Sequence, residues 1–179
     1  GYFDGEHVRT VRAGAVILAC WHAMIPYLVP DLPQHRRSAL LRTVRAPMLY
    51  ATVQVRDWRA WHAAGIDRVR FTGAYWSDVR LPALPHAGGR QAADPGEPTT
   101  VHLVRLAVKP GMDPAASAVA GRRELAAVPY RYLEFTVRDQ LARLLGPTGF
   151  DPARDIEGLT VNRWAHGIPL GSGGPEGSG

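Results

Sequence analysis

The chain has a single cysteine, Cys20, among its 179 residues. One thiol excludes an intrachain disulfide and any metal site built on a Cys-x-x-Cys pair. The seven histidines are dispersed, and none stands in a His-x-His or His-Glu-x-x-His arrangement. We therefore expect no metal site from this chain alone.

Lysine is nearly absent, since Lys109 is the only lysine among 21 basic residues. The arginines are scattered, and their longest blocks are the pairs 36–37 and 122–123. A protein that binds nucleic acid usually gathers its basic residues on one face or in one run. We therefore attribute the net charge of +5 to a composition bias and expect no nucleic-acid partner.

An apolar run near the start, AGAVILACWHAMIPYL at 13–28, is too short to cross a membrane. A bilayer span takes about 20 predominantly apolar residues. This run has 16 residues, with Gly14, His22 and Pro26 inside it. We expect no membrane span, and the apolar residues 15–19 instead predict a strand that is buried on both faces.

The residues before this run predict part of a hairpin. Asp4-Gly5 is typical of a hairpin turn, and residues 7–11 can form the strand that follows it. Only three residues precede the turn, so most of the first strand is absent. We therefore expect the sequence to begin inside a fold.

The middle of the chain alternates short helices and strands. Residues 46–58 have the clearest strand pattern, because Leu49, Ala51, Val53 and Val55 alternate with more polar residues. The other elements expected here are a short helix near Pro26, a helix after Pro33, a helical turn at 59–65, strands at 67–76 and 101–108, and a long loop at 82–100.

The last third predicts two helices and a strand. Asp113-Pro114 begins the first helix, and Pro129 divides the helical region. An apolar stripe with helical spacing follows, and Gly146-Pro147 ends it. A strand is expected at 155–164, followed by a flexible Gly/Ser-rich tail at 168–179. Together these elements predict an α+β fold with a mixed sheet.

Several residues are candidates for chemistry. Cys20 and His22 are close in sequence, but residues two apart do not face each other, so a buried structural thiol is the expected role of Cys20. Trp58, Trp61 and His62 share one helical face, which favours packing over a cofactor site. Tyr75 and Trp76 could line a substrate cavity or cap a strand end.

The segment VNRWAHG, 161–167, is the densest polar and aromatic cluster in the chain. Binding groups are common at the end of a strand. His166 could act in proton transfer, or it could hold the turn before Gly167. Asn162, Arg163 and Trp164 complete this candidate site.

The sequence resembles FAD-dependent oxidoreductases of the amine-oxidase type, and spermidine dehydrogenase-like flavoproteins in particular. The resemblance rests on VILACWHAMIPYLVPDLP (16–33), PMLYATVQVRDWRAW (47–61) and RDQLARLLGPTGFDPARDIEGLTVNRW (138–164) with the His-Gly that follows. It covers most of residues 8–167, and the segment FDPARDI…TVNRW is its most specific part.

The resemblance implies a substrate-type domain attached to the last strands of a Rossmann-like FAD-binding domain. Residues 1–20 would be the remnant of the FAD-binding domain, and 21–167 the substrate domain, with a returning strand at 156–164. Ala19 and Cys20 would approach FAD through their backbone. Trp164 and His166 would lie on the substrate side of the flavin. The implied reaction removes a hydride from the carbon beside an amine nitrogen, with a polyamine as one candidate substrate.

The chain departs from the family pattern in three ways. It lacks the Gly-x-Gly-x-x-Gly unit and the closing flavin-contact segment, and Ala165 and Ile168 stand where the family usually has Pro and Tyr. We therefore expect the rest of the FAD domain to lie in the same parent chain and this part alone to be inactive. The alternative is a non-enzymatic basic α+β module that binds a protein partner or nucleic acid.

Overall fold

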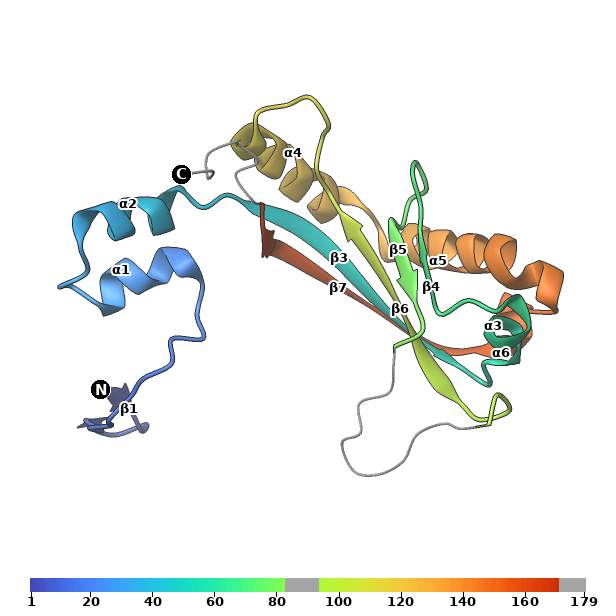
Figure 1. Cartoon of the computed structure of the whole chain (residues 1–179), viewed down its shortest axis with the longest axis horizontal. Coiled ribbons are helices and arrows are strands. Elements are labelled where there is room, and N and C mark those ends of the chain that lie inside the picture. The colour runs from blue at the N-terminus through green and yellow to red at the C-terminus, as the bar shows by residue number, and fades with distance from the viewer. Residues whose placement is uncertain (83–93, 171–179) are drawn as a thin grey trace, which may run out of the picture. The chain divides into compact units, whose positions relative to one another are not determined.

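The computed structural model describes residues 1–82 and 94–170 and divides the chain into two compact units. The first unit is Gly1–Thr43, and the second begins at Val44. Each is described by itself below (Figure 1). The expected boundary at residue 20, between a cofactor-domain remnant and a substrate domain, stays a prediction.

The first unit opens with the predicted hairpin. Strand β1 (Tyr2–Phe3) pairs with the antiparallel strand β2 (Val8–Arg9). The Asp4 carboxylate accepts hydrogen bonds from the backbone N–H groups of Glu6 and His7 at 3.1 and 2.8 Å, and Gly5 has a φ of 105°. An aspartate that bonds its own turn, followed by a glycine with positive φ, is what this turn requires.

The prediction of a buried strand at 15–19 is wrong. These residues form no strand and are exposed, with Ile17 exposing 91% of its surface. A strand needs a neighbour to accept and donate its backbone hydrogen bonds. None of the described strands pairs with this segment.

Three short helical segments complete the first unit. They are the 3-10 helix η1 (His22–Met24), α1 (Ile25–Leu28) and α2 (Gln34–Arg42), as predicted around Pro26 and after Pro33. Pro26 is the only buried residue among 1–43, all of which the structure describes. The first unit therefore has almost no core of its own.

The second unit is built on a five-stranded antiparallel sheet in the order β4-β5-β6-β3-β7. Its longest strands are β3 (Arg45–Val55), β6 (Thr99–Leu106) and β7 (Ile156–Pro169), while β4 (Arg68–Arg70) and β5 (Asp78–Arg80) are short. The α+β class is confirmed. The sheet is antiparallel, however, and not mixed.

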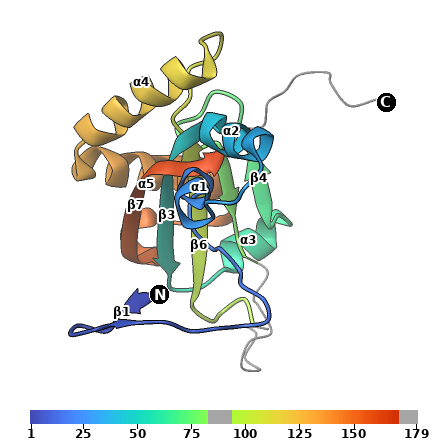
Figure 2. The same ribbon diagram turned by 90° about the vertical axis from the view of Figure 1, so that its left-hand side faces the viewer.

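Two helices, α4 (Pro114–Ala127) and α5 (Tyr130–Leu145), lie on the same side of the sheet (Figure 2). The strand residues that face them are fully buried in one core cluster with the apolar stripe of α5. The predicted alternation in β3 and the predicted helical stripe are thereby confirmed. The cluster includes Leu49, Ala51, Val53 and Val55 of β3 and Leu133, Val137, Leu141 and Leu145 of α5.

Local sequence signals set the ends of these helices. The Asp113 carboxylate accepts the backbone N–H of Ala116 at 3.0 Å and caps α4, as predicted. Pro129 separates α4 from α5, also as predicted. Gly121 lies where α4 meets the sheet, and a Cβ there would come within 1.8 Å of the Ala107 carbonyl oxygen.

The remaining elements connect the sheet. They are α3 (Arg59–Ala64), the 3-10 helix η2 (Gly146–Thr148) and α6 (Pro152–Asp155). The expected strand at 67–76 is shorter than predicted, and β5 was not predicted. The expected loop at 82–100 falls partly outside the described residues, and β6 begins within its range, at Thr99.

The last strand, β7, continues to Pro169, so the tail does not begin at 168. Residues 171–179 of the expected tail lie outside the described residues. No helix in the described part of the chain is both long enough and apolar enough to cross a membrane.

Candidate functional site

The face of the sheet that is turned away from α4 and α5 carries aromatic and polar side chains. We call it the uncovered face. Tyr50 lies opposite Asn162, and Met48 lies opposite Trp164. Directly opposed residues share a face, and neighbouring residues of a strand point to opposite faces. Because Leu49 and Ala51 face the helices, Tyr50, Asn162 and Trp164 face away from them. Trp164 exposes 52% of its surface.

His102 belongs to the same face, next to Tyr50. It lies opposite Thr52, and its Nδ1 is 3.4 Å from the Thr52 hydroxyl oxygen. The rings of Tyr50 and His102 have centroids 5.1 Å apart. Burial, and then the positive charge of Arg80, lower the pKa of His102 below 6.5. The imidazole is therefore neutral near pH 7, with one ring nitrogen that donates and one that accepts.

The sequence indicated Asn162 and Trp164 but missed Tyr50 and His102. Tyr50 was identifiable as a residue on the less buried side of the predicted strand at 46–58. Nothing local marks His102, because its place in the site comes from the pairing of β6 with β3.

His166 lies in an irregular part of β7. The β3–β7 register shifts between Ala46 and Met48, so residues 165–167 form a bulge there. His166 is partly buried in it. A Cβ at Gly167 would be 2.5 Å from the Met48 Cβ, which explains why glycine follows the histidine.

Arg163 faces the opposite side of the sheet from its neighbours. It lies opposite Leu49, and its Nη2 donates to the Val128 carbonyl at 2.6 Å. Arg163 therefore fastens β7 to the α4–α5 junction. It is separated from the face that carries Asn162 and Trp164.

Ala19 and Cys20, the predicted cofactor-contact residues, lie in the first unit. Both are exposed and neither belongs to a strand. The expected buried position of the Cys20 thiol is therefore wrong. Its exposure follows from the missing pairing of residues 15–19.

Trp76 is a core residue. It is fully buried, and its Nε1 donates to the Thr136 hydroxyl at 3.1 Å. Gln140 of α5 bonds both backbone polar atoms of Trp76, accepting from its N–H at 3.0 Å and donating to its carbonyl at 2.8 Å. These bonds fix the loop before β5 to α5.

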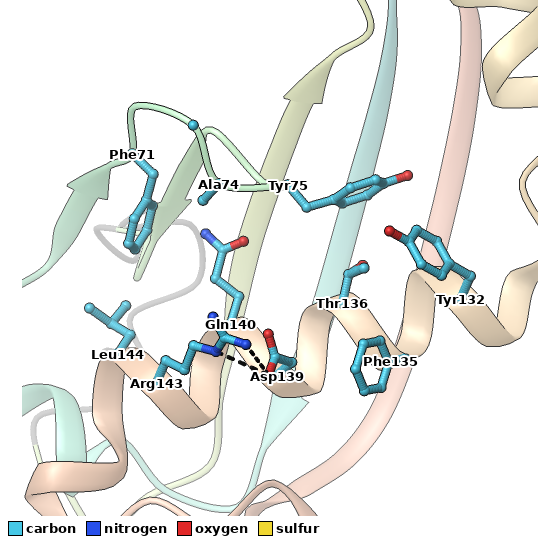
Figure 3. Close-up of a pocket in the computed structure, with 11 residues that line it drawn as sticks. Phe71, Ala74, Tyr75, Tyr132, Phe135, Thr136, Asp139, Gln140, Arg143 and Leu144 are labelled. Atoms are coloured by element: carbon cyan, nitrogen blue, oxygen red, sulfur yellow. Dashed lines mark hydrogen bonds and ion pairs between the residues drawn. The ribbon is translucent and has the colours of Figure 1, made fainter.

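Tyr75 does line a pocket, on the helix side of the sheet. The pocket has a volume of about 580 Å³ and lies between the loop that follows β4 and one side of α5 (Figure 3). The Arg105 guanidinium lies 4.3 Å from the centre of the Tyr75 ring. Burial raises the pKa of Tyr75, so the phenol stays protonated. Tyr75 and Trp164 therefore belong to different sites on opposite sides of the sheet.

The aromatic residues Trp58 and Trp61, at the start of α3, have the expected packing role. Trp61 is buried in the core cluster, and Trp58 packs against that cluster. The rings of Trp58 and His62 meet edge to face, with centroids 5.7 Å apart. This arrangement fills the end of the core.

The described residues include no group of three His, Cys, Asp or Glu side chains that could hold a metal ion. They also contain no glycine-rich turn between a strand and a helix of the kind that holds a dinucleotide pyrophosphate. No family model matches the chain, and no curated protein sequence matches it.

Proposed function

We propose that this chain supplies the substrate-side domain of an FAD-dependent oxidoreductase of the amine-oxidase type, similar to spermidine dehydrogenase. The reaction is oxidation of an amine C–N bond by hydride transfer to the flavin. The observation that carries the proposal is the two-sided sheet, with helices on one face and Tyr50, His102, Asn162 and Trp164 on the other.

This face has the chemistry that an amine site needs. Aromatic faces attract an ammonium group through the ring quadrupole, and Trp164 and Tyr50 provide such faces. The Asn162 amide supplies hydrogen-bond donors and an acceptor, and the neutral imidazole of His102 can accept one more hydrogen bond. We assign substrate contact to these residues, with His166 in the adjoining bulge.

The described residues do not by themselves hold FAD, because they lack a pyrophosphate-binding turn. In this proposal the remainder of the FAD domain belongs to the same gene product. It covers the apolar side chains that the first unit exposes, which include Val16 and Ile17. Ala19 and Cys20 lie at the end of that segment and would approach the cofactor.

The proposal is tested in the complete gene product that contains residues 1–179. Trp164→Ala removes an exposed aromatic face, so we expect the rate of flavin reduction by an amine to fall by about tenfold or more. Val119→Ala, on the exposed side of α4, is the matched control and leaves the rate unchanged. Equal rates in wild type and Trp164→Ala would contradict the assignment of this face.

One observation favours the alternative of a basic binding module. The register places Arg68, Arg70 and Arg80 on the same uncovered face. Asp78 pairs with Arg68 at 2.6 Å and with Arg70 at 3.5 Å, which leaves a net positive strip. This alternative predicts that the chain binds a polyanion with an affinity that falls steeply with salt. If the complete gene product carries no flavin and its affinity for a polyanion falls steeply with salt, the binding module would be the better explanation.

A further inference from the structure

The pocket beneath the Tyr75 loop is a second candidate binding site, separate from the uncovered face of the sheet. Its volume of about 580 Å³ falls in the range of small-molecule sites, which is roughly 300–1,000 Å³. Four aromatic side chains contribute to its walls: Phe71, Tyr75, Tyr132 and Phe135. Figure 3 shows Phe71 and Tyr75 on the loop and Tyr132 and Phe135 on α5.

The pocket is held open by bonds that do not involve a ligand. Gln140 clamps the Trp76 backbone to α5 from both sides, and Thr136 accepts the Trp76 indole N–H. Tyr75 is fixed by Arg105, whose Nη1 donates to its carbonyl at 3.0 Å. A ligand would therefore meet a formed site and would not have to order the loop.

Thr136 and Gln140 are already committed to protein partners, whereas the buried Tyr75 hydroxyl has no hydrogen-bond partner among the described residues. Thr136 accepts from Trp76 and donates to the Leu133 carbonyl at 2.8 Å, and the Gln140 amide is used on both its oxygen and its nitrogen. The Tyr75 hydroxyl is neutral, so a charged group placed deep in the pocket would lose water and gain at most one neutral partner.

Among the described residues, the charged side chains in the lining form an ion pair with each other. Arg143 and Asp139 are 3.1 Å apart, and Arg143 is largely exposed. These two formal charges cancel, and the Arg105 guanidinium already lies over the Tyr75 ring, where a cation would otherwise be attracted. Aromatic walls with neutral lining select a flat apolar ring.

We propose that this pocket binds a neutral, planar aromatic molecule. The inference does not depend on the proposed flavin chemistry, since the pocket and the uncovered face lie on opposite sides of the sheet.

Indole, tryptamine and indole-3-acetate share one ring system and differ in charge, so they test both the site and the ligand class. Each is titrated into the full chain and followed by NMR. We expect saturable binding of indole, with the two charged compounds binding no tighter. An absence of saturable indole binding overturns the site, and a charged analogue that binds about tenfold tighter overturns the neutral class.

Variants locate the binding. Ala74→Phe fills the pocket and is expected to weaken indole binding by about tenfold or more, whereas Phe135→Ala removes one wall and weakens it several-fold. Phe135 exposes 60% of its surface, so its truncation tests the site even if Ala74→Phe disturbs the fold. Phe3→Ala, which removes an exposed phenyl in the first unit, is the control. Unchanged affinity in Phe135→Ala and in a folded Ala74→Phe would place indole elsewhere and overturn the proposal.

Discussion

Gln140 is a buried polar residue that joins α5 to the loop before β5 through both backbone polar atoms of Trp76. Gln140→Leu would leave the N–H and the carbonyl of Trp76 without these partners in the core. An unsatisfied buried group costs about 1–3 kcal/mol, so we expect the free energy of unfolding to fall by about 3 kcal/mol. Urea denaturation measures the change.

Gln54→Leu is the matched control, because Gln54 is exposed on β3. It should change the free energy of unfolding by less than about 0.5 kcal/mol. Equal effects of the two substitutions would mean that the Trp76 backbone is satisfied in another way.

Glu124 gives the stability a defined pH dependence. Hydrogen bonds from Lys109 and then Arg105 lower the pKa of Glu124 below 4.5. Because the folded-state pKa is the lower one, this stabilisation is present above pH 4.5 and is lost as the pH falls through the folded-state pKa.

We therefore expect Glu124→Gln to lower the free energy of unfolding by about 1 kcal/mol at neutral pH. The loss should become smaller as the pH falls below 4.5. Denaturation at a series of pH values measures the difference between the two proteins. A difference that stays constant through the acid range would contradict the ion pairs.

Residues 162–164 lie on a strand, so their side chains alternate between the two faces of the sheet. Asn162 and Trp164 were predicted together with Arg163, although neighbours in a strand point to opposite faces. The structure separates them in this way, with Arg163 bonded to Val128. Tyr75 and Trp76 also have different places, one in the pocket and one in the core. The sequence could not predict this, because they lie in an irregular loop without a regular side-chain periodicity.

At the scale of elements, the close contact between α4 and the sheet depends on Gly121. A Cβ there would overlap the Ala107 carbonyl oxygen and lie 2.8 Å from Pro47 Cγ. Gly121→Ala should therefore lower the free energy of unfolding by about 3 kcal/mol, as expected for strong overpacking. Thermal and urea unfolding measure it.

Gly146→Ala is the same substitution without the clash. Gly146 has an ordinary helical conformation with a φ of −53°, and nothing lies within 4 Å of its missing Cβ. We expect no loss of stability there, because alanine loses less backbone entropy than glycine on folding. If both glycine variants were equally stable, the packing of α4 on the sheet would be wrong.

The strongest sequence patterns predicted their elements well. β3 has a long alternation, α5 has a long helical stripe, and Pro129 separates two helices. β5 was missed because it has only three residues and gains its buried Val79 contacts from β6 and the core. The prediction of a strand at 15–19 failed because an apolar run predicts burial but does not supply a neighbouring strand to pair with.

At the scale of the whole molecule, the core cluster lies entirely within the second unit, while the first unit buries only Pro26. We expect residues 44–179 to unfold cooperatively at the same urea concentration as the full chain. Removing 1–43 should also raise the soluble fraction, because it removes exposed apolar side chains such as Ile17. A fragment without a cooperative transition would show that the first unit is needed for folding.

The proposed role of the uncovered face of the sheet is that of the substrate wall in a flavin-dependent amine oxidoreductase. Its most direct test is the absorbance spectrum of the complete gene product, recorded without oxygen before and after an amine such as spermidine is added. We expect flavin absorbance bands that bleach as the amine is oxidised. A complete gene product that carries no flavin, or whose flavin no amine reduces, would contradict it.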